Sequence, residues 1–341
     1  MASCPQATIS RFHFGVRMKN IMLETIPHPW TRQHIRQALM SDFTAARKSI
    51  DQTEGGLLWR DIGELDDAIW VFSKSTTEML DEISIFGERT KDSEFWSSAN
   101  DKNDDHFVRE VKRKLYYSTS SLMTIVDIAR AFNKKWPVEG VVEKRDMYFT
   151  TPGLHDFLQR LRNFSSHWRI AEANWQISSD FKTGIRTARF LVRKDELLEW
   201  NDWGAKARKY IEDTEGSIDV LKIFSQYKKN VQDYYRWHKG ALLDEYSTIL
   251  RPYFEYKRTY EGLQKALSWN LVLSHFKADL NPYEYLSKYL TDKQVELVLS
   301  YEHRSEQQVD ALIRILDMEE FCDEQLKNKV MKVLNVPNGH S

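Results

Sequence analysis

Residues 105–136, DHFVREVKRKLYYSTSSLMTIVDIARAFNKKW, decide the fold, because they carry apolar side chains at helical spacing over about nine turns. Val111, Leu115, Leu122 and Ile125 follow one another at intervals of four, seven and three residues, which places them on one face of an α-helix. Pro137 comes directly after this stretch and cannot continue a helix. The spacing therefore predicts one long helix with a buried face.

The segments on either side extend the same pattern. Residues 62–86 predict a second long helix, and the polar stretch 90–105 between the two predicts a loop. Residues 151–168 predict a shorter amphipathic helix that opens with Thr151-Pro152, whereas residues 138–150 show no period. Residues 174–193 change to an extended pattern that predicts a β-hairpin. Helical patterning resumes near Lys194, so we expect a mainly α fold with one small hairpin.

Breaks in the pattern suggest how the chain is organised. Residues 1–28 lack a period, and His28-Pro29 favours a boundary, because the residue before a proline is disfavoured in a helix. We expect an N-terminal arm at 1–28, a helical domain with the hairpin at 29–240, and additional C-terminal helices at 241–341. Helices in that last region are expected at about 281–289, 292–301 and 305–334.

Composition excludes several classes of protein. The 49 Lys and Arg residues balance 50 Asp and Glu residues, which removes the simplest signature of a nucleic-acid-binding domain, a strongly basic one. The two cysteines, Cys4 and Cys322, can form neither a disulfide framework nor a cysteine-based zinc site, and their scarcity fits a reducing compartment. No apolar run reaches the roughly 18–20 residues that a membrane span needs. We expect a cytoplasmic protein with no membrane association.

No metal site is predicted, and no cofactor. The acidic loop at 101–112 starts like a calcium loop, but His106 stands at the position that needs glycine and Lys112 at the position that needs glutamate. No two histidines are spaced four apart on a helix, which removes the simplest zinc geometry.

One set of polar residues stands out, in the segment FLQRLRNFSSHW at 157–168. Asn163 and His167 are four residues apart and share a helix face, whereas Arg162 and His167 are five apart, or about 140° around an ideal helix. Arg162 would therefore have to curl around the helix to join them. Ser166 follows Arg162 by four residues, so the face opposite the apolar stripe is dense in polar groups.

These residue types suit the cleavage of a phosphodiester. A histidine can act as base or acid at neutral pH, so His167 could take the proton of an RNA 2′-OH, whose oxygen then attacks the adjacent phosphate. The forked, permanently charged Arg162 suits the extra negative charge of the transition state. Asn163 could bond to the phosphate or orient the imidazole. Substrate contacts are expected from Ser166 and from a basic strip on the helix 105–136: Arg109, Lys112 and Arg113.

The arrangement Arg162-Asn163-x-x-x-His167 resembles the motif of the HEPN superfamily, the higher eukaryotes and prokaryotes nucleotide-binding domains. That resemblance implies an α-helical bundle, usually dimeric, in which two motifs face each other across a two-fold axis. It also implies a metal-independent endoribonuclease of the kind found in toxin–antitoxin and anti-phage systems, with RNA as its substrate. Since this chain has one motif, it implies a homodimer, or a partner that supplies a second motif. The C-terminal helices would regulate, dimerise or bind a regulatory partner protein. The hairpin and the last hundred residues depart from a minimal HEPN bundle.

Two other functions remain open. The chain could be a non-catalytic helical scaffold or sensor that acts through protein association. In that case Arg162 and His167 would be separated or buried in structural hydrogen bonds, with no cleft at a dimer interface. It could also be the HEPN-type partner of a nucleotidyltransferase, although no residue is identified as the modified one.

Overall fold

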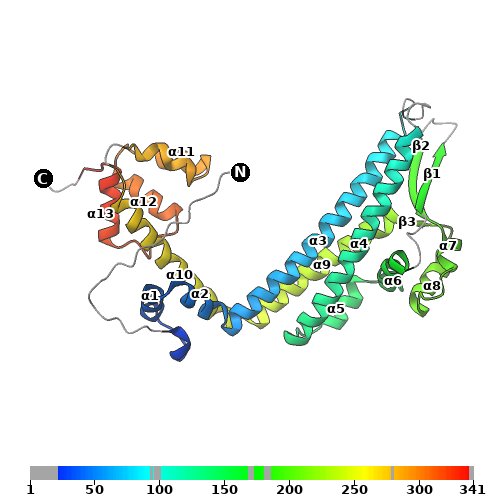
Figure 1. The fold of residues 1–341 in the computed structure, drawn as a ribbon, viewed down its shortest axis with the longest axis horizontal. Helices are drawn as coiled ribbons and strands as arrows, with labels where there is room; N and C mark the ends of the chain where they lie inside the picture. Colours follow the sequence, from blue (N-terminus) through cyan, green and yellow to red (C-terminus); the bar gives the residue numbers. More distant parts are fainter. Residues whose placement is uncertain are drawn as a thin grey trace. The chain divides into compact units, whose positions relative to one another are not determined.

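The computed structural model describes residues 22–92, 95, 101–167, 173–179, 186–277 and 280–337, and of residues 101–105, 167, 173 and 186 it describes the backbone alone. The described chain is mainly α-helical with one small antiparallel sheet, which confirms the predicted fold class (Figure 1). It divides into two compact units. The first, called here the motif unit, is Leu58–Thr248; the second, the terminal unit, comprises the residues before and after it. Residues 1–21 of the expected N-terminal arm lie outside the described residues.

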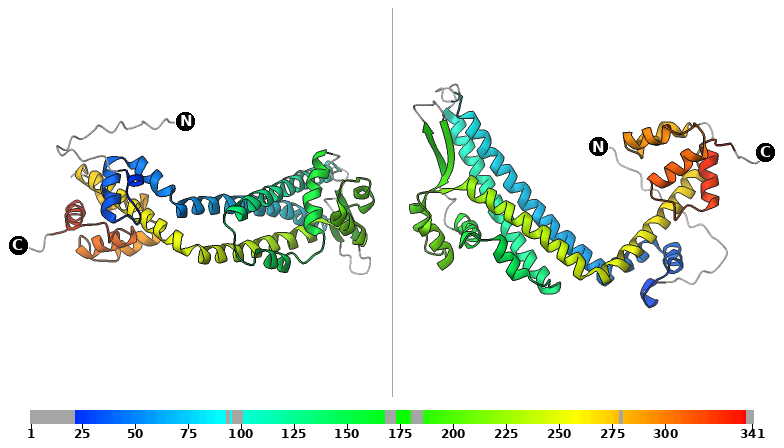
Figure 2. Two further views of the ribbon diagram at one scale, coloured as in Figure 1. Left: turned by 90° about the horizontal axis from the view of Figure 1, so that it is seen from below. Right: turned by 180° about the vertical axis from the view of Figure 1, so that it is seen from behind.

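Three long helices form the body of the motif unit: α3 (Glu54–Arg89), α4 (Asp101–Lys135) and α9 (Val220–Glu245). They run side by side in all views (Figures 1 and 2). Ion pairs along α3 fix its antiparallel course to α4, through Lys114–Glu82 at 2.5 Å and Lys135–Asp61 at 2.6 Å. The apolar face predicted for residues 105–136 lies in the core, where Val111, Leu115, Leu122 and Ile125 are all buried.

The predicted hairpin is present. β1 (Ala173–Ser179) pairs antiparallel with β2 (Arg186–Val192), in a register that sets Trp175 opposite Phe190. A two-residue strand, β3 (Ile218–Asp219), extends the sheet beside β2. The Trp175 ring stacks on Phe86 of α3 with ring centroids 3.7 Å apart, so the hairpin packs against the long helices.

Shorter helices complete the motif unit: α5 (Val141–Tyr148), α6 (Leu154–His167), α7 (Lys194–Leu198) and α8 (Ala205–Asp213). The segment 138–150, predicted to be irregular, contains α5. Since α5 buries none of its residues completely, it has no apolar stripe from which to predict it. The start of α6 also differs, because Thr151–Gly153 form a turn and the helix begins at Leu154.

The terminal unit contains a 3₁₀ turn at Leu23–Thr25, α1 (Arg32–Ser41), α2 (Phe43–Asp51) and most of α10 (Ser247–Ser274). After α10 come η4 (Pro282–Lys288), α11 (Asp292–Leu299), α12 (Glu306–Ile315) and α13 (Glu324–Val333). The grouping differs from the expected domains 29–240 and 241–341, because residues before 58 pack with residues after 248. The Trp30 backbone N–H donates to the Tyr256 hydroxyl at 3.0 Å, and Arg47 pairs with Glu261 at 3.2 Å.

The single helix predicted for 305–334 is two helices, α12 and α13. The backbone turns at Asp317, which has a positive φ of 50°, and the next residue, Met318, is completely buried. Asp323 then caps α13 by accepting a hydrogen bond from the Leu326 N–H at 2.9 Å.

Within the described parts of the chain, no helix combines the length and the apolar character needed to span a membrane.

Candidate functional site

Helix α6 carries the predicted catalytic residues, and its apolar face fixes the helix in the motif unit. Phe157, Leu158, Leu161 and Phe164 are each at most 1% exposed. The Phe164 ring stacks on Trp203, with centroids 5.3 Å apart. This anchoring leaves the opposite face of α6 free to present polar groups.

The polar face of α6 brings together a row of side chains from four successive turns. His155, Gln159, Arg162 and Ser166 are separated by four, three and four residues, so they share one side of the helix. Arg162 is half-buried, and its Nη1 donates a hydrogen bond to the Asn163 Oδ1 at 3.3 Å. His167 ends α6, and its side chain lies outside the described part of the structure. The arginine and amide of the motif are therefore in contact, and the backbone places His167 one turn beyond Asn163.

A tyrosine from the neighbouring helix α4 joins this face. The Tyr116 hydroxyl is hydrogen-bonded to Ser166 and lies in the field of Arg162. The hydroxyls of Ser166 and Ser120 and the positive charge of Arg162 stabilise the phenolate, so they lower the pKa of Tyr116 below its ordinary value. Tyr116 is half-buried and is thus a polar group that a bound phosphate beside Arg162 could also meet.

The basic strip predicted on α4 divides into two parts. Arg109 and Lys112 precede Tyr116 by seven and four residues and so lie on its side of the helix. Among the described side chains, neither forms an ion pair. Arg113 is engaged by the Glu110 carboxylate at 2.7 Å, which raises the pKa of the guanidinium, and it lies over the Tyr117 ring. The structure therefore places Arg109 and Lys112, rather than Arg113, as the available cations beside Tyr116.

A pocket of about 670 Å³ opens beside the first turns of α6, within the motif unit. Its floor is apolar and aromatic, with buried side chains from α4 and α9 that include Leu122, Ile125, Tyr227 and Tyr234. Its rim is charged: Arg130, Arg145, Asp146, Asp156, Lys206, Lys209 and Asp213. Arg162, Asn163 and Ser166 are not part of its lining, so the pocket is separate from the motif residues.

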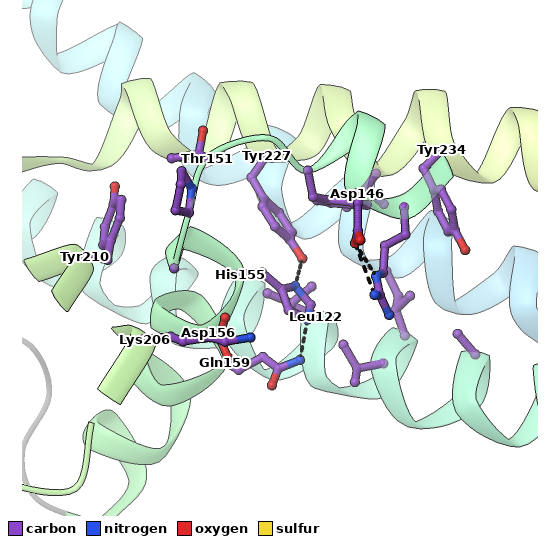
Figure 3. A pocket seen from close by; sticks show the side chains of 18 of the residues that line it. Leu122, Asp146, Thr151, His155, Asp156, Gln159, Lys206, Tyr210, Tyr227 and Tyr234 are labelled. Atoms are coloured by element: carbon purple, nitrogen blue, oxygen red, sulfur yellow. Dashed lines mark hydrogen bonds and ion pairs between the residues drawn. The ribbon is translucent and has the colours of Figure 1, made fainter. Parts of the chain in front are cut away.

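His155 stands in this pocket between two hydrogen-bonding partners (Figure 3). Its Nδ1 is 2.5 Å from the Tyr227 hydroxyl, and its Nε2 is 2.7 Å from the side-chain amide of Gln159. The Tyr227 hydroxyl is fully buried, and burial raises its pKa well above the ordinary value, so it keeps its proton. The side-chain amide N–H of Gln159 donates to Nε2, so the hydrogen of the neutral imidazole lies on Nδ1 and is donated to the Tyr227 hydroxyl oxygen.

The surroundings of His155 keep its imidazole neutral. Burial is the main cause that lowers the pKa of His155; Asp156 opposes this effect, and the positive charges of Arg145, Arg130 and Lys206 add to it. Asp156 has the largest charge effect on the imidazole, and the three cations act against it.

Sequence analysis missed His155, Gln159, Tyr227 and Tyr116 as members of polar clusters. A signal for the first two was available, since they continue the face of Arg162 and Ser166 toward the start of α6. No such signal existed for Tyr116 and Tyr227, which come from helices distant in sequence.

Within the described residues, no group of three His, Cys, Asp or Glu side chains has the arrangement of a metal site.

Comparison with known proteins returns no family model, no curated protein and no solved structure that matches this chain.

Proposed function

We propose that the chain is a metal-independent endoribonuclease of the HEPN type, with Arg162, Asn163 and His167 as its catalytic residues. The observation that carries this proposal is the polar face of α6, where Arg162 contacts Asn163 and lies beside the Tyr116–Ser166 pair. A charged guanidinium surrounded by neutral hydrogen-bonding groups is suited to a phosphodiester.

In the proposed reaction a base removes the proton of the ribose 2′-OH, and the 2′-oxygen attacks the adjacent phosphorus. The bond from phosphorus to the 5′-oxygen breaks, and an acid supplies the proton that this leaving oxygen needs. His167 serves one of these two roles, and Arg162 stabilises the charge that develops on the phosphoryl oxygens. Asn163 positions Arg162 through their hydrogen bond.

Arg109 and Lys112 extend the proposed site along α4. Because they share a helix side with Tyr116, a strand of RNA bound at Arg162 could continue past Tyr116 toward these cations. Membership of a toxin or anti-phage system and control by a partner protein are part of the same proposal.

The test measures cleavage of a labelled RNA by purified protein and its variants. His167→Ala should reduce the rate by about 10²–10⁴, the usual effect of losing a general acid or base. Arg162→Ala should do similar damage, and Arg162→Lys should restore little, because an ammonium cannot replace the forked guanidinium. Asn163→Ala should have a smaller effect.

Arg160→Ala is the matched control, since Arg160 is an exposed arginine on the same helix outside the polar row. It should cleave RNA as the wild type does.

Cleavage should also persist in EDTA, whereas loss in EDTA and recovery with a divalent ion would mean that a different site acts. If His167→Ala cleaved RNA at the wild-type rate, the ribonuclease proposal would fall and the scaffold function would replace it.

A further inference from the structure

The pocket around His155 has the composition of a ligand site rather than of a packing defect. Aromatic rings from three elements gather in it: Phe149 between α5 and α6, Tyr210 on α8, and Tyr227 and Tyr234 on α9. The Phe149 ring lies 5.3 Å from Tyr227 and 5.8 Å from Tyr234, measured between centroids. Figure 3 shows Tyr227 and Tyr234 descending from α9 toward the cavity. Such a wall offers edges and faces against which a planar ring can pack.

The rim of the same pocket favours negative charge. Lys206 is exposed at the rim, and within the described part of the chain no carboxylate forms an ion pair with it. Lys209 and Arg145, by contrast, are neutralised by Asp213 at 3.0 Å and by Asp146 at 3.1 Å. Of the charges that act on His155, Asp156 has the largest effect and raises its pKa, whereas Arg145, Arg130 and Lys206 each lower it. An anionic group would therefore be stabilised near Lys206.

We propose that this pocket binds a small molecule that combines a planar aromatic ring with a carboxylate or phosphate group. The ring packs against the partly exposed rings of Phe149 and Tyr210, beneath which Tyr227 and Tyr234 are buried, and the anion pairs with Lys206. A volume of about 670 Å³ lies within the range of small-molecule sites, roughly 300–1,000 Å³. The Tyr227–His155–Gln159 chain fixes the floor in a neutral, hydrogen-bonded state, so no buried charge opposes the ring.

This site is independent of the proposed ribonuclease activity, because none of the motif residues lines the pocket. The binding experiment therefore needs no RNA. His167→Ala protein should bind the ligand as the wild type does, which separates failure of this proposal from failure of the proposed function.

The experiment is isothermal titration calorimetry of the full chain with two anionic probes, AMP and indole-3-acetate. Their uncharged counterparts, adenosine and indole, serve as ligand controls. At least one anionic probe should bind with a dissociation constant below about 1 mM and at least ten-fold more tightly than its uncharged counterpart. Binding of AMP alone would identify a phosphate ligand, and binding of indole-3-acetate alone a carboxylate ligand.

Lys206→Ala should weaken that binding about ten-fold or more, as expected for a charge-assisted contact. Arg208→Ala is the matched protein control, since Arg208 lies on the same helix, pairs with Glu212 at 2.9 Å and does not line the pocket. It should bind as the wild type does. Absence of binding by both anionic probes, or equal binding by wild type and Lys206→Ala, would overturn the proposal.

Discussion

At the scale of single residues, the chain holds a neutral histidine where several charges meet. His155 is held by Tyr227 and Gln159, and burial lowers its pKa below 6.5 although Asp156 opposes this effect. An imidazole with a lowered pKa binds fewer protons in the folded chain than in the unfolded chain. Its contribution to stability is therefore complete above about pH 6.5 and is lost as the pH falls toward the folded-state pKa.

We expect the free energy of unfolding to decrease when the pH is lowered from 8 to 5.5, and His155 to account for part of this decrease. His155→Gln should show a smaller decrease, because glutamine keeps a polar partner for Tyr227 but does not titrate. Urea unfolding at both pH values measures this. His238, also buried with a lowered pKa, contributes in the same direction in both proteins and cancels from the comparison. Identical losses in the two proteins would show that His155 is not a source of the pH dependence.

The polar residues also show where sequence reasoning reaches its limit. The spacing of Arg162, Asn163 and Ser166 predicts a shared helix face, because helical geometry alone fixes it. Tyr116 and Tyr227 reach α6 from α4 and α9, and they are 50 and 72 residues away along the chain from Ser166 and His155. Only the packing of those helices decides which of their tyrosines meet α6, and local periodicity carries no information on that choice.

At the scale of elements, α6 depends on its buried face and on the turn that starts it. Phe164→Ala should lower the free energy of unfolding by about 3–5 kcal/mol, because Phe164 is 1% exposed and packs between Trp200 and Trp203. Urea unfolding with Arg160→Ala as the exposed control, expected within about 0.5 kcal/mol of wild type, provides the measurement. A loss below about 1 kcal/mol would mean that α6 is not anchored as described.

Gly153 tests the start of the same helix. It has a positive φ of 75°, and an added Cβ would lie 2.5 Å from the Lys206 carbonyl oxygen on α8. Gly153→Ala should therefore lower the melting temperature, through backbone strain of about 1–3 kcal/mol and the clash with α8. Gly63→Ala is the opposite control, because Gly63 lies within α3 with open space around its Cα, and alanine there should stabilise by about 1 kcal/mol. Equal melting temperatures for the two variants would contradict this account.

Elements with a strong apolar stripe are also those that the sequence predicts. Helices α3 and α4 appear in the pattern, because each buries one face. In the hairpin, Phe190 and Val192 of β2 alternate with more exposed neighbours. Helix α5 buries no residue completely and leaves no such trace. The association of α1 and α2 with α10 escapes prediction for another reason, since it depends on long-range contacts such as Trp30 with Tyr256.

At the scale of the whole molecule, the proposed chemistry needs two acid–base groups, and each chain has one motif histidine, His167. We therefore predict a homodimer in which two motifs share one active site. One chain has a mass of 40.4 kDa, so light scattering at micromolar concentration should give a mass of about twice that value. A mass near that of a single chain would count against the shared site.

The division into two units has a consequence for the order in which the protein is made. All residues of the motif unit have been synthesised once Thr248 is added, whereas residues 22–57 of the terminal unit must wait for partners that follow it. At about 5–20 residues per second, translation of the remaining residues of this sequence takes on the order of 5–20 s. During that interval the motif unit can fold on the ribosome while Trp30 and its neighbours still lack the α10 surface against which they pack. Residues 22–57 are therefore translated before the motif unit but reach their native contacts only after the motif unit has been synthesised.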